Sequence, residues 1–341
     1  MPADAPENPR QAFYRRIDSR HLAPLWEVLA ALVPPQPRSI LEPVHWSFAE
    51  VLPHLEEAGR LISAEEAERR VLVLENPALR GKSQITRSLY AGIQLLLPGE
   101  VAHSHRHTAT AIRLVIEGRG GFTSVDGERT PMEAGDFIIT PSGTFHDHSN
   151  PGSEPVVWLD GLDVPMIQMF EAGFSERNPD PHQLLDRADD ESMDRYAHNM
   201  RPVGVPGPAR NPLFRYPYAR TRAVLQRMAE RAPAHPCHGH KQEFVDPTTG
   251  GPATPTMAAF MQWLPRGFRG AAHRATDGTV FCVVEGEGAS LVGERRIEWK
   301  PHDVFVVPSW VPVSHECDGD AVLFSFSDRP VQQALRIWKE A

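Results

Sequence analysis

Three histidines in the first half of the chain have the types and spacing of metal ligands. His105 and His107 are separated by one residue. Side chains alternate between the two faces of a strand, so both rings project from the same face. His146 follows a Pro-Ser-Gly turn at residues 141–143 and lies at the end of an apolar segment. Because imidazole binds Fe, Zn, Cu and Ni alike, the pattern predicts a metal site without naming the metal.

Sixteen histidines are scattered through the chain, so the alternative is that these three lie in ordinary surface hairpins. That alternative leaves the spacing and the surrounding glycines and prolines unexplained, and we favour the metal site. A second group, Cys-His-Gly-His at residues 237–240, has a superficially similar spacing. It lies between prolines without a comparable partner cluster, and we interpret it as a polar loop.

The segments around the histidines are typical of short strands joined by turns. Residues 110–117 are rich in β-branched and aliphatic side chains, and the Asp-Gly pair at 126–127 favours a hairpin. If the first of these strands has no bulge, Arg113 faces the same cavity as the histidines. Its planar guanidinium suits a carboxylate, so we predict that it anchors a substrate. The alternative is a structural ion pair with Glu117 or Asp136.

Glycines and prolines at fixed distances from these histidines resemble the two motifs of the cupin superfamily. The matching residues are Gly99, His105, His107 and Gly118 in the first motif, and Gly135, Pro141, Gly143, His146 and Asn150 in the second. One position differs, because Ala111 stands where cupins usually have a metal-binding glutamate. The resemblance therefore implies three neutral imidazoles without a protein carboxylate.

The second half of the chain repeats the first. Gly267 precedes His273 by six residues, as in the first motif, and Val-Val-Glu-Gly at 283–286 repeats Val-Ile-Glu-Gly at 115–118. Such an internal duplication predicts two similar units, each with its own hydrophobic barrel.

The internal alignment also predicts which half binds the metal. The ligand positions of the second half become His273, Ala275 and Val313, so only one histidine remains. We therefore expect the second barrel to have lost its metal. His315 aligns with His148 and not with the ligand His146, which favours loss of the site over a shift of the site.

Length and composition are those of a globular protein with about two domains. The chain has 341 residues, of which 41% are hydrophobic and 23% charged, and its net charge is −9. This balance indicates no nucleic-acid partner, and no apolar run approaches the roughly 18 residues of a membrane helix. The first residues lack signal-peptide features, and the three cysteines form no disulfide framework. We therefore expect a cytoplasmic protein without membrane partners.

Helical and strand patterns divide the chain into four parts. Apolar residues recur at helical spacing in 22–32, whereas alternating and apolar strand-like runs begin near residue 71. We expect an all-β core of two double-stranded β-helix (jelly-roll) barrels, which is a bicupin. The expected parts are a helical N-terminal arm (1–70), an N-terminal barrel with the metal site (71–175), a linker with a helix (176–250) and a C-terminal barrel with a degenerate site (251–341).

Longer segments narrow the resemblance to one family. From about residue 10, the chain resembles the gentisate 1,2-dioxygenases, a family that includes salicylate, nitrosalicylate and 1-hydroxy-2-naphthoate dioxygenases. The segments that match are Leu74–Pro77, Ser88–Gly92, Pro98–Glu100, His105–Thr108, Asp126–Thr130, Gly135–Pro141 and His146–His148. The resemblance implies non-haem Fe(II) held by His105, His107 and His146, with O₂ and an ortho-hydroxylated aromatic carboxylate as substrates. Its default reaction converts gentisate and O₂ to maleylpyruvate.

The resemblance also implies roles for residues near the metal. Arg113 binds the substrate carboxylate, and His148 acts as an acid/base group toward the phenol or the bound oxygen. Alternatively, His148 orients a neighbouring ligand.

Further positions match the substrate pocket of the family. Gln94 and Asp160 occupy such positions, and Asp160 is placed to address a distal ring hydroxyl. Arg69 adds a second carboxylate contact, although the adjacent Arg70 leaves open which arginine reaches the pocket. For each of these residues, a structural hydrogen bond or ion pair is the alternative.

Two other classes of function use a similar fold. A metal-dependent cupin isomerase or lyase would work without O₂, but the missing glutamate at Ala111 and the family segments argue against it. A binding or storage bicupin would not need three intact ligands in one barrel. By analogy with other bicupins, we expect a homodimer or homotetramer.

Overall fold

The computed structural model describes residues 8–198, 200, 202–204 and 207–341. The chain forms two compact units, residues 1–38 and residues 39–341. Among the described residues, no helix is both long enough and apolar enough to cross a membrane.

The first unit contains two helices, α1 (Pro9–Asp18) and α2 (Leu25–Leu32). Asn8 caps α1, because its side chain accepts a hydrogen bond from the backbone N–H of Arg10. The indole of Trp26 donates to the hydroxyl of Tyr14 over 2.9 Å and so joins α2 to α1. Apolar side chains of α2 such as Leu29 remain half exposed, so this helix has not covered its apolar face within its own unit.

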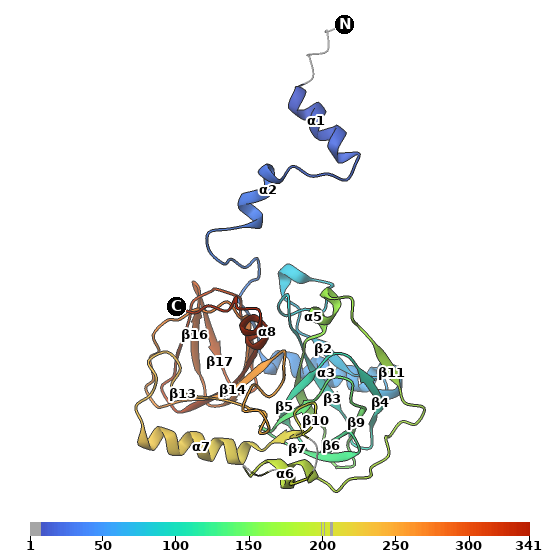
Figure 1. Ribbon diagram of the computed structural model, residues 1–341. Helices are drawn as coiled ribbons and strands as arrows, with labels where there is room; N and C mark the ends of the chain where they lie inside the picture. Colours follow the sequence, from blue (N-terminus) through green and yellow to red (C-terminus); the bar gives the residue numbers. More distant parts are fainter. Residues whose placement is uncertain (1–7, 199, 201, 205–206) are drawn as a thin grey trace. The chain divides into compact units, whose positions relative to one another are not determined.

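The second unit contains the two predicted barrels (Figure 1). In the N-terminal barrel, a six-stranded sheet with the order β12-β8-β5-β10-β3-β2 faces a five-stranded sheet with the order β11-β4-β9-β6-β7. The bounds are β2 Val71–Val73, β3 Tyr90–Leu96, β4 Val101–His107, β5 Ala111–Glu117, β6 Arg119–Val125, β7 Glu128–Glu133, β8 Phe137–Thr140, β9 His146–Ser149, β10 Val156–Leu162, β11 Ser175–Arg177 and β12 Arg215–Tyr216.

The C-terminal barrel repeats this arrangement. Its larger sheet has the order β1-β18-β15-β20-β14-β13, and its smaller sheet has the order β17-β16-β19. The bounds are β1 Val44–Trp46, β13 His240–Glu243, β14 Ala258–Leu264, β15 Thr279–Glu285, β16 Gly288–Val292, β17 Arg295–Trp299, β18 Val304–Val307, β19 Val313–Glu316 and β20 Ala321–Ser327. The central order β18-β15-β20-β14 matches β8-β5-β10-β3, which confirms the bicupin prediction.

One pair of glycines shows how closely the duplication is kept. Gly118 and Gly286 follow equivalent strands and adopt φ values of +103° and +79°. A Cβ atom would lie 2.4 Å from the carbonyl oxygen of Pro155 at the first position and 2.3 Å from that of Asp320 at the second. Both turns therefore require glycine for its backbone conformation and for its lack of a side chain.

The segments predicted as arm and linker are not purely helical. Strand β1 pairs with β18 of the C-terminal barrel, β13 pairs with β14, and β12 pairs with β8. The helices are α3 Phe48–Leu61, α4 Ala64–Ala67, α5 Val164–Met169, α6 Glu191–Tyr196, α7 Tyr218–Arg231 and α8 Arg329–Ala334, with one 3₁₀ turn at Pro77–Leu79. Because β1 and β13 are short, a periodicity of two could not be recognised in them from the sequence.

Strand alternation decides which side chains enter each barrel. A single apolar cluster joins the two large sheets and includes Ile112 and Leu114 from β5 and Cys282 from β15. Separate clusters fill the barrel interiors, with Trp158 in the first and Phe281 in the second. Residues between those of the shared cluster therefore face a barrel interior.

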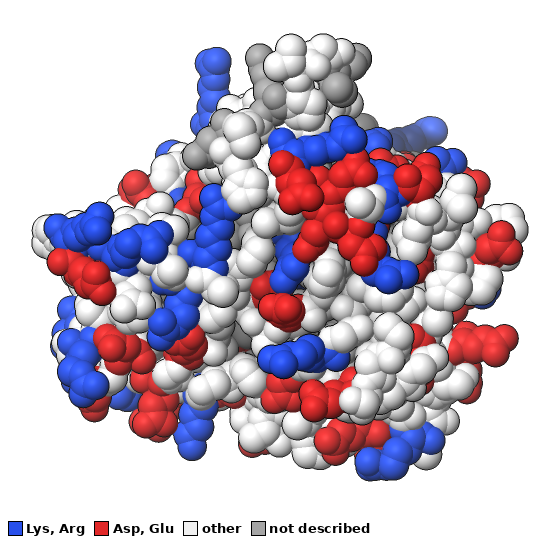
Figure 2. Space-filling model, turned by 90° about the horizontal axis from the view of Figure 1, so that it is seen from below, with Lys and Arg blue, Asp and Glu red and all other residues white. Residues whose placement is uncertain are grey.

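Charged side chains of both signs are interspersed on the face of the molecule that includes α6 and α7 (Figure 2). A buried ion-pair network connects Arg215 of β12 to the residues that precede β8 and α6. Nε of Arg215 lies 2.7 Å from a carboxylate oxygen of Asp136, and Nη1 lies 2.7 Å from one of Asp190. Arg215 thereby connects the linker to the turn before β8.

Replacing Arg215 with methionine is expected to destabilise the protein by about 3–5 kcal/mol, because Asp136 would be left as an unpaired buried charge. The measurement is thermal unfolding followed by circular dichroism. The control is Arg296→Met, since Arg296 is 56% exposed in its pair with Glu316 and should contribute less than about 1 kcal/mol. Equal losses for the two variants would contradict a stabilising role of the network.

Candidate metal centre and substrate pocket

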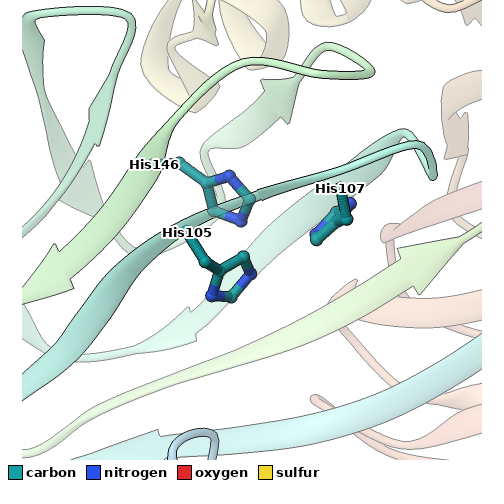
Figure 3. Close-up of side chains that lie close together, drawn as sticks. All are labelled: His105, His107 and His146. Carbon is teal, nitrogen blue, oxygen red and sulfur yellow. The ribbon is translucent and has the colours of Figure 1, made fainter. Parts of the chain in front are cut away.

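The three predicted ligand histidines converge inside the N-terminal barrel (Figure 3). His105 and His107 come from β4, and His146 comes from the neighbouring strand β9, where it is paired with His105. The ring centroids are 4.5 Å apart for His105 and His146, and 4.9 Å for His107 and His146. One nitrogen atom from each ring lies within 4.8 Å of the others, so one ion can contact all three rings.

The donor set fits a transition metal. Burial lowers the pKa of His107 and His146, and it lowers the pKa of His105 to about 2, so all three imidazoles are neutral near pH 7. Nδ1 of His107 is 2.8 Å from the carbonyl oxygen of Ala109. Donation from Nδ1 to that carbonyl leaves the lone pair on Nε2, the atom that can bind a metal.

Arg113 enters the same interior from β5, as its strand parity predicted. It is 4% exposed, and its Nη1 donates to the hydroxyl of Thr140 over 2.6 Å. Its Nε lies 3.2 Å from a carboxylate oxygen of Asp160, the residue paired with it on β10. The proposed carboxylate anchor and the proposed hydroxyl acceptor therefore contact each other.

The alternative partners named for Arg113 are wrong. Asp136 binds Arg215, and Glu117 lies 3.3 Å from His302 of the C-terminal half. Glu117 is at the far end of β5, and the turn containing Asp136 is directed toward the linker. The residues that pair with Glu117 and Asp136 are distant from them in the sequence, so these pairs could not be predicted from sequence spacing.

His148 and Gln94 are buried, and each has a polar atom without a hydrogen-bond partner in the described part of the chain. The Nδ1 atom of His148 lies 2.9 Å from the hydroxyl of Thr123, and its Nε2 is unpartnered. The Nε2 donor of Gln94 is likewise unpartnered, although the side chain is only 2% exposed. Leaving such groups unpaired costs about 1–3 kcal/mol each, so both atoms are available to a ligand or water.

The two adjacent arginines, Arg69 and Arg70, have different partners in the structure. Arg70 forms a bidentate pair with Glu100, with N–O distances of 2.7 and 2.8 Å. Arg69 instead places Nη2 2.8 Å from Nδ1 of His105 and 2.9 Å from the carbonyl oxygen of His103. Arg69 is therefore the arginine beside the metal centre, and Arg70 braces the barrel wall.

Sequence reasoning missed Thr123 and Thr140. Thr123 is opposite His148 in the pairing of β6 with β9, and Thr140 ends the otherwise apolar strand β8. A threonine at an interior position of a strand is a weak signal by itself. The contacts of Thr123 with His148 and of Thr140 with Arg113 can be identified only when the neighbouring strands are known.

The C-terminal barrel does not reproduce the metal centre. His273 pairs with Val313 in a short bridge, and Ala275 offers no ligand atom. The loop at 237–240 does not supply a metal group either: among the described residues, only the first-barrel histidines form a cluster of three ligand side chains.

Comparison with known proteins agrees with this architecture. A family model described as "Cupin domain" matches residues 92–162. The chain is 49% identical over 333 residues to gentisate 1,2-dioxygenase 1 of Aquipseudomonas alcaligenes, covering 97% of this chain and 96% of that protein. It is 34% identical over 339 residues to 1-hydroxy-2-naphthoate 1,2-dioxygenase of Nocardioides sp. (strain KP7), covering 97% and 87%.

The chain belongs to the gentisate 1,2-dioxygenase family. Members of this family are dioxygenases, and the protein is accordingly an oxidoreductase. A crystal structure of salicylate 1,2-dioxygenase from Pseudoaminobacter salicylatoxidans, described with gentisate adducts, superposes with a TM-score of 0.92. That comparison has 34% identity and covers 100% of this chain and 95% of the other. The bicupin fold is thus shared along the whole chain.

Proposed function

We propose that this member of the gentisate 1,2-dioxygenase family is an Fe(II)-dependent enzyme that cleaves the ring of gentisate with O₂ to give maleylpyruvate. The observation that carries the proposal is the three-histidine cluster beside the buried guanidinium of Arg113. A neutral ligand set leaves the charge of a divalent ion uncompensated, and an anionic ortho-hydroxycarboxylate provides the compensating charge.

The ligands would be His105, His107 and His146, and Fe(II) would supply coordination of the hydroxycarboxylate and the redox chemistry toward O₂. Arg113 would bind the substrate carboxylate, with the hydroxyl of Thr140 holding its guanidinium in place. Positively charged Arg69 adds to the attraction for an anion at the same wall.

The unpartnered ring atom of His148 supports its assignment as the acid/base group. Thr123 holds the opposite nitrogen, and the indole of Trp158 lies 5.2 Å from the ring, so the imidazole has a fixed orientation. Nε2 would exchange a proton with the phenolic hydroxyl. Gln94 would donate a hydrogen bond from its free amide to the substrate.

The proposed reaction is tested with protein reconstituted anaerobically with Fe(II). Oxygen uptake is measured with gentisate, salicylate, 5-nitrosalicylate and 1-hydroxy-2-naphthoate, and the product is identified by mass spectrometry. We expect one O₂ consumed per gentisate, with gentisate preferred over the other three. Product formation without O₂ uptake would indicate an isomerase or lyase, and binding without turnover would indicate a storage protein.

Asp160→Ala is expected to reduce gentisate turnover more than salicylate turnover, because only gentisate has the distal hydroxyl. We expect the ratio of kcat/KM values for the two substrates to change by about tenfold, the effect of one buried hydrogen bond. Both values should also fall together to some extent, since Asp160 compensates the charge of Arg113. An unchanged ratio would mean that Asp160 only positions Arg113.

His148→Ala is expected to slow every substrate by about 10²- to 10⁴-fold while iron stays bound, as for the loss of a general acid/base group. The measurements are kcat for gentisate and salicylate and iron per chain by elemental analysis. Loss of iron together with activity would instead assign His148 to the support of the ligands.

We also propose that the protein is cytoplasmic and assembles as a dimer or tetramer. The three cysteines are free thiols, which is the state favoured in a reducing compartment. The exposed apolar side chains of α2 provide a surface that association with another subunit would cover.

A further inference from the structure

The interior of the C-terminal barrel contains buried polar side chains that the proposed reaction does not use. Gln262, His315 and Ser325 are each at most 1% exposed. Both amide atoms of Gln262, Nε2 of His315 and the hydroxyl of Ser325 have no hydrogen-bond partner among the residues that the structure describes. Because each unpaired group costs about 1–3 kcal/mol, this cluster requires a polar occupant.

Strand parity shows that these groups face the same interior. Gln262 lies between Met261 and Trp263, and both neighbours belong to the cluster shared by the two barrels. Ser325 lies between two phenylalanines of that same cluster. His315 is two residues from Val313 on β19 and so shares its face, and Val313 is part of the C-terminal interior. All three side chains are therefore directed into the C-terminal barrel.

Lys241 adds a positive charge to this interior. It is paired with Gln262 across β13 and β14, so the two side chains project from the same face of the sheet. Its ammonium lies 4.4 Å from the ring centroid of Phe260. Among the described residues, no carboxylate forms an ion pair with Lys241.

One acidic residue that acts on Lys241, Asp277, already has its own partners. Asp277 lies 3.1 Å from Nε of Arg329, and it accepts from the hydroxyl of Ser327 over 2.6 Å and from the indole of Trp338 over 2.8 Å. Its charge is therefore compensated by Arg329. The ammonium of Lys241 has no ion-pair partner within 4.0 Å among the described residues, and it feels the carboxylates of Asp277, Glu243 and Glu340 only at longer range.

The duplicated barrel shows which polar groups are kept and which are lost. Gln262 occupies the place of Gln94, and the Ser290–His315 contact of 2.8 Å repeats the Thr123–His148 contact of 2.9 Å. The fifth residue of β20, however, is Ser325, whereas the fifth residue of β10 is Asp160. The carboxylate of the first barrel is thus absent from the second.

Two aromatic side chains limit the size of a ligand in this barrel. Phe281 stands at the position of Arg113 and stacks on Phe305 with ring centroids 4.9 Å apart. These rings fill the part of the barrel that the guanidinium occupies in the N-terminal half. An occupant that contacts the remaining polar groups must therefore be small.

We propose that the C-terminal barrel contains a metal-independent site for a small, acetate-sized carboxylate, bound by the ammonium of Lys241 and by hydrogen bonds from Gln262, His315 and Ser325. A carboxylate provides both the negative charge and the acceptor atoms that this group lacks. The proposal does not depend on the reaction of the N-terminal barrel.

The test uses the iron-loaded full-length protein and ¹⁹F NMR with trifluoroacetate as the probe. Besides any binding beside Arg113, we expect one equivalent of saturable binding that is lost or weakened at least about tenfold in Lys241→Met and in Gln262→Leu. Gln262→Leu keeps nearly the same volume, so it reports on hydrogen bonding even if the lysine variant does not fold. The control is Lys339→Met, which removes an exposed lysine and should leave binding unchanged.

Competition identifies the chemistry of the ligand. Displacement of the probe by acetate, but not by an equal concentration of chloride, is the expected result. Equal binding in wild type and in both interior variants would overturn the proposal, as would an absence of displacement by acetate or equal displacement by chloride. The readout is binding, so the result is independent of whether gentisate is the substrate.

Discussion

His105→Ala, His107→Ala and His146→Ala are each expected to abolish activity and to weaken iron binding by more than about 100-fold. Loss of a residue that merely orients a ligand typically costs 10- to 100-fold in metal affinity, and loss of the ligand itself should cost more. The three rings surround one position, so the remaining two cannot replace the missing nitrogen. Iron per chain is measured by elemental analysis after gel filtration.

His273→Ala is the matched control, since His273 is the equivalent of His105 in the C-terminal barrel. Its partner positions are Ala275 and Val313, so iron content should stay near that of the wild type. Wild-type protein should hold one iron per chain. Two irons per chain, or loss of iron in His273→Ala, would contradict a single metal centre.

Arg113→Lys is expected to lower kcat/KM for gentisate by about 100-fold while iron content is unchanged. An ammonium is a point charge and cannot reproduce the planar fork that contacts Thr140 and Asp160 while binding a carboxylate. Truncating one side of a buried charged contact costs about 2–5 kcal/mol, which corresponds to roughly 30- to 4,000-fold. The measurement is steady-state oxygen uptake over a range of gentisate concentrations.

Arg106→Lys provides the control for this substitution. Arg106 lies on β4 between the two ligand histidines, but its side chain is 39% exposed and pairs with Glu176. Activity should therefore stay within about twofold of the wild type, because exposed ion pairs contribute little. If Arg113→Lys were as active as this control, Arg113 would have only a structural role.

The metal centre was predictable because its pattern is local. Alternation along a strand places His105 and His107 on one face, whatever the rest of the fold. Turn glycines and the spacing of the second motif then bring His146 to the neighbouring strand. The same reasoning predicted the duplication and the loss of ligands in the C-terminal barrel, since these follow from residue types at repeated positions.

The parity of Arg113 was also determined locally, but its partner was not. The sequence offered Glu117 and Asp136 as neighbours, whereas the structure pairs Arg113 with Asp160 on β10. Which strands become neighbours depends on the closure of the whole barrel, and these two positions are 47 apart in the sequence numbering. The choice between Arg69 and Arg70 was likewise decided by tertiary contacts. Arg70 contacts Glu100, and Arg69 contacts His105.

The polar interior of the C-terminal barrel shows the same division most clearly. The sequence by itself determined that this barrel lacks two of three metal ligands, because that conclusion needs only an internal alignment. Lys241 belongs to a segment predicted as linker. Only the tertiary structure decided that this segment contains the edge strand β13, which places Lys241 opposite Gln262. A short strand at a sheet edge has too few residues to show periodicity, so its side chains acquire a place only when its neighbour is folded.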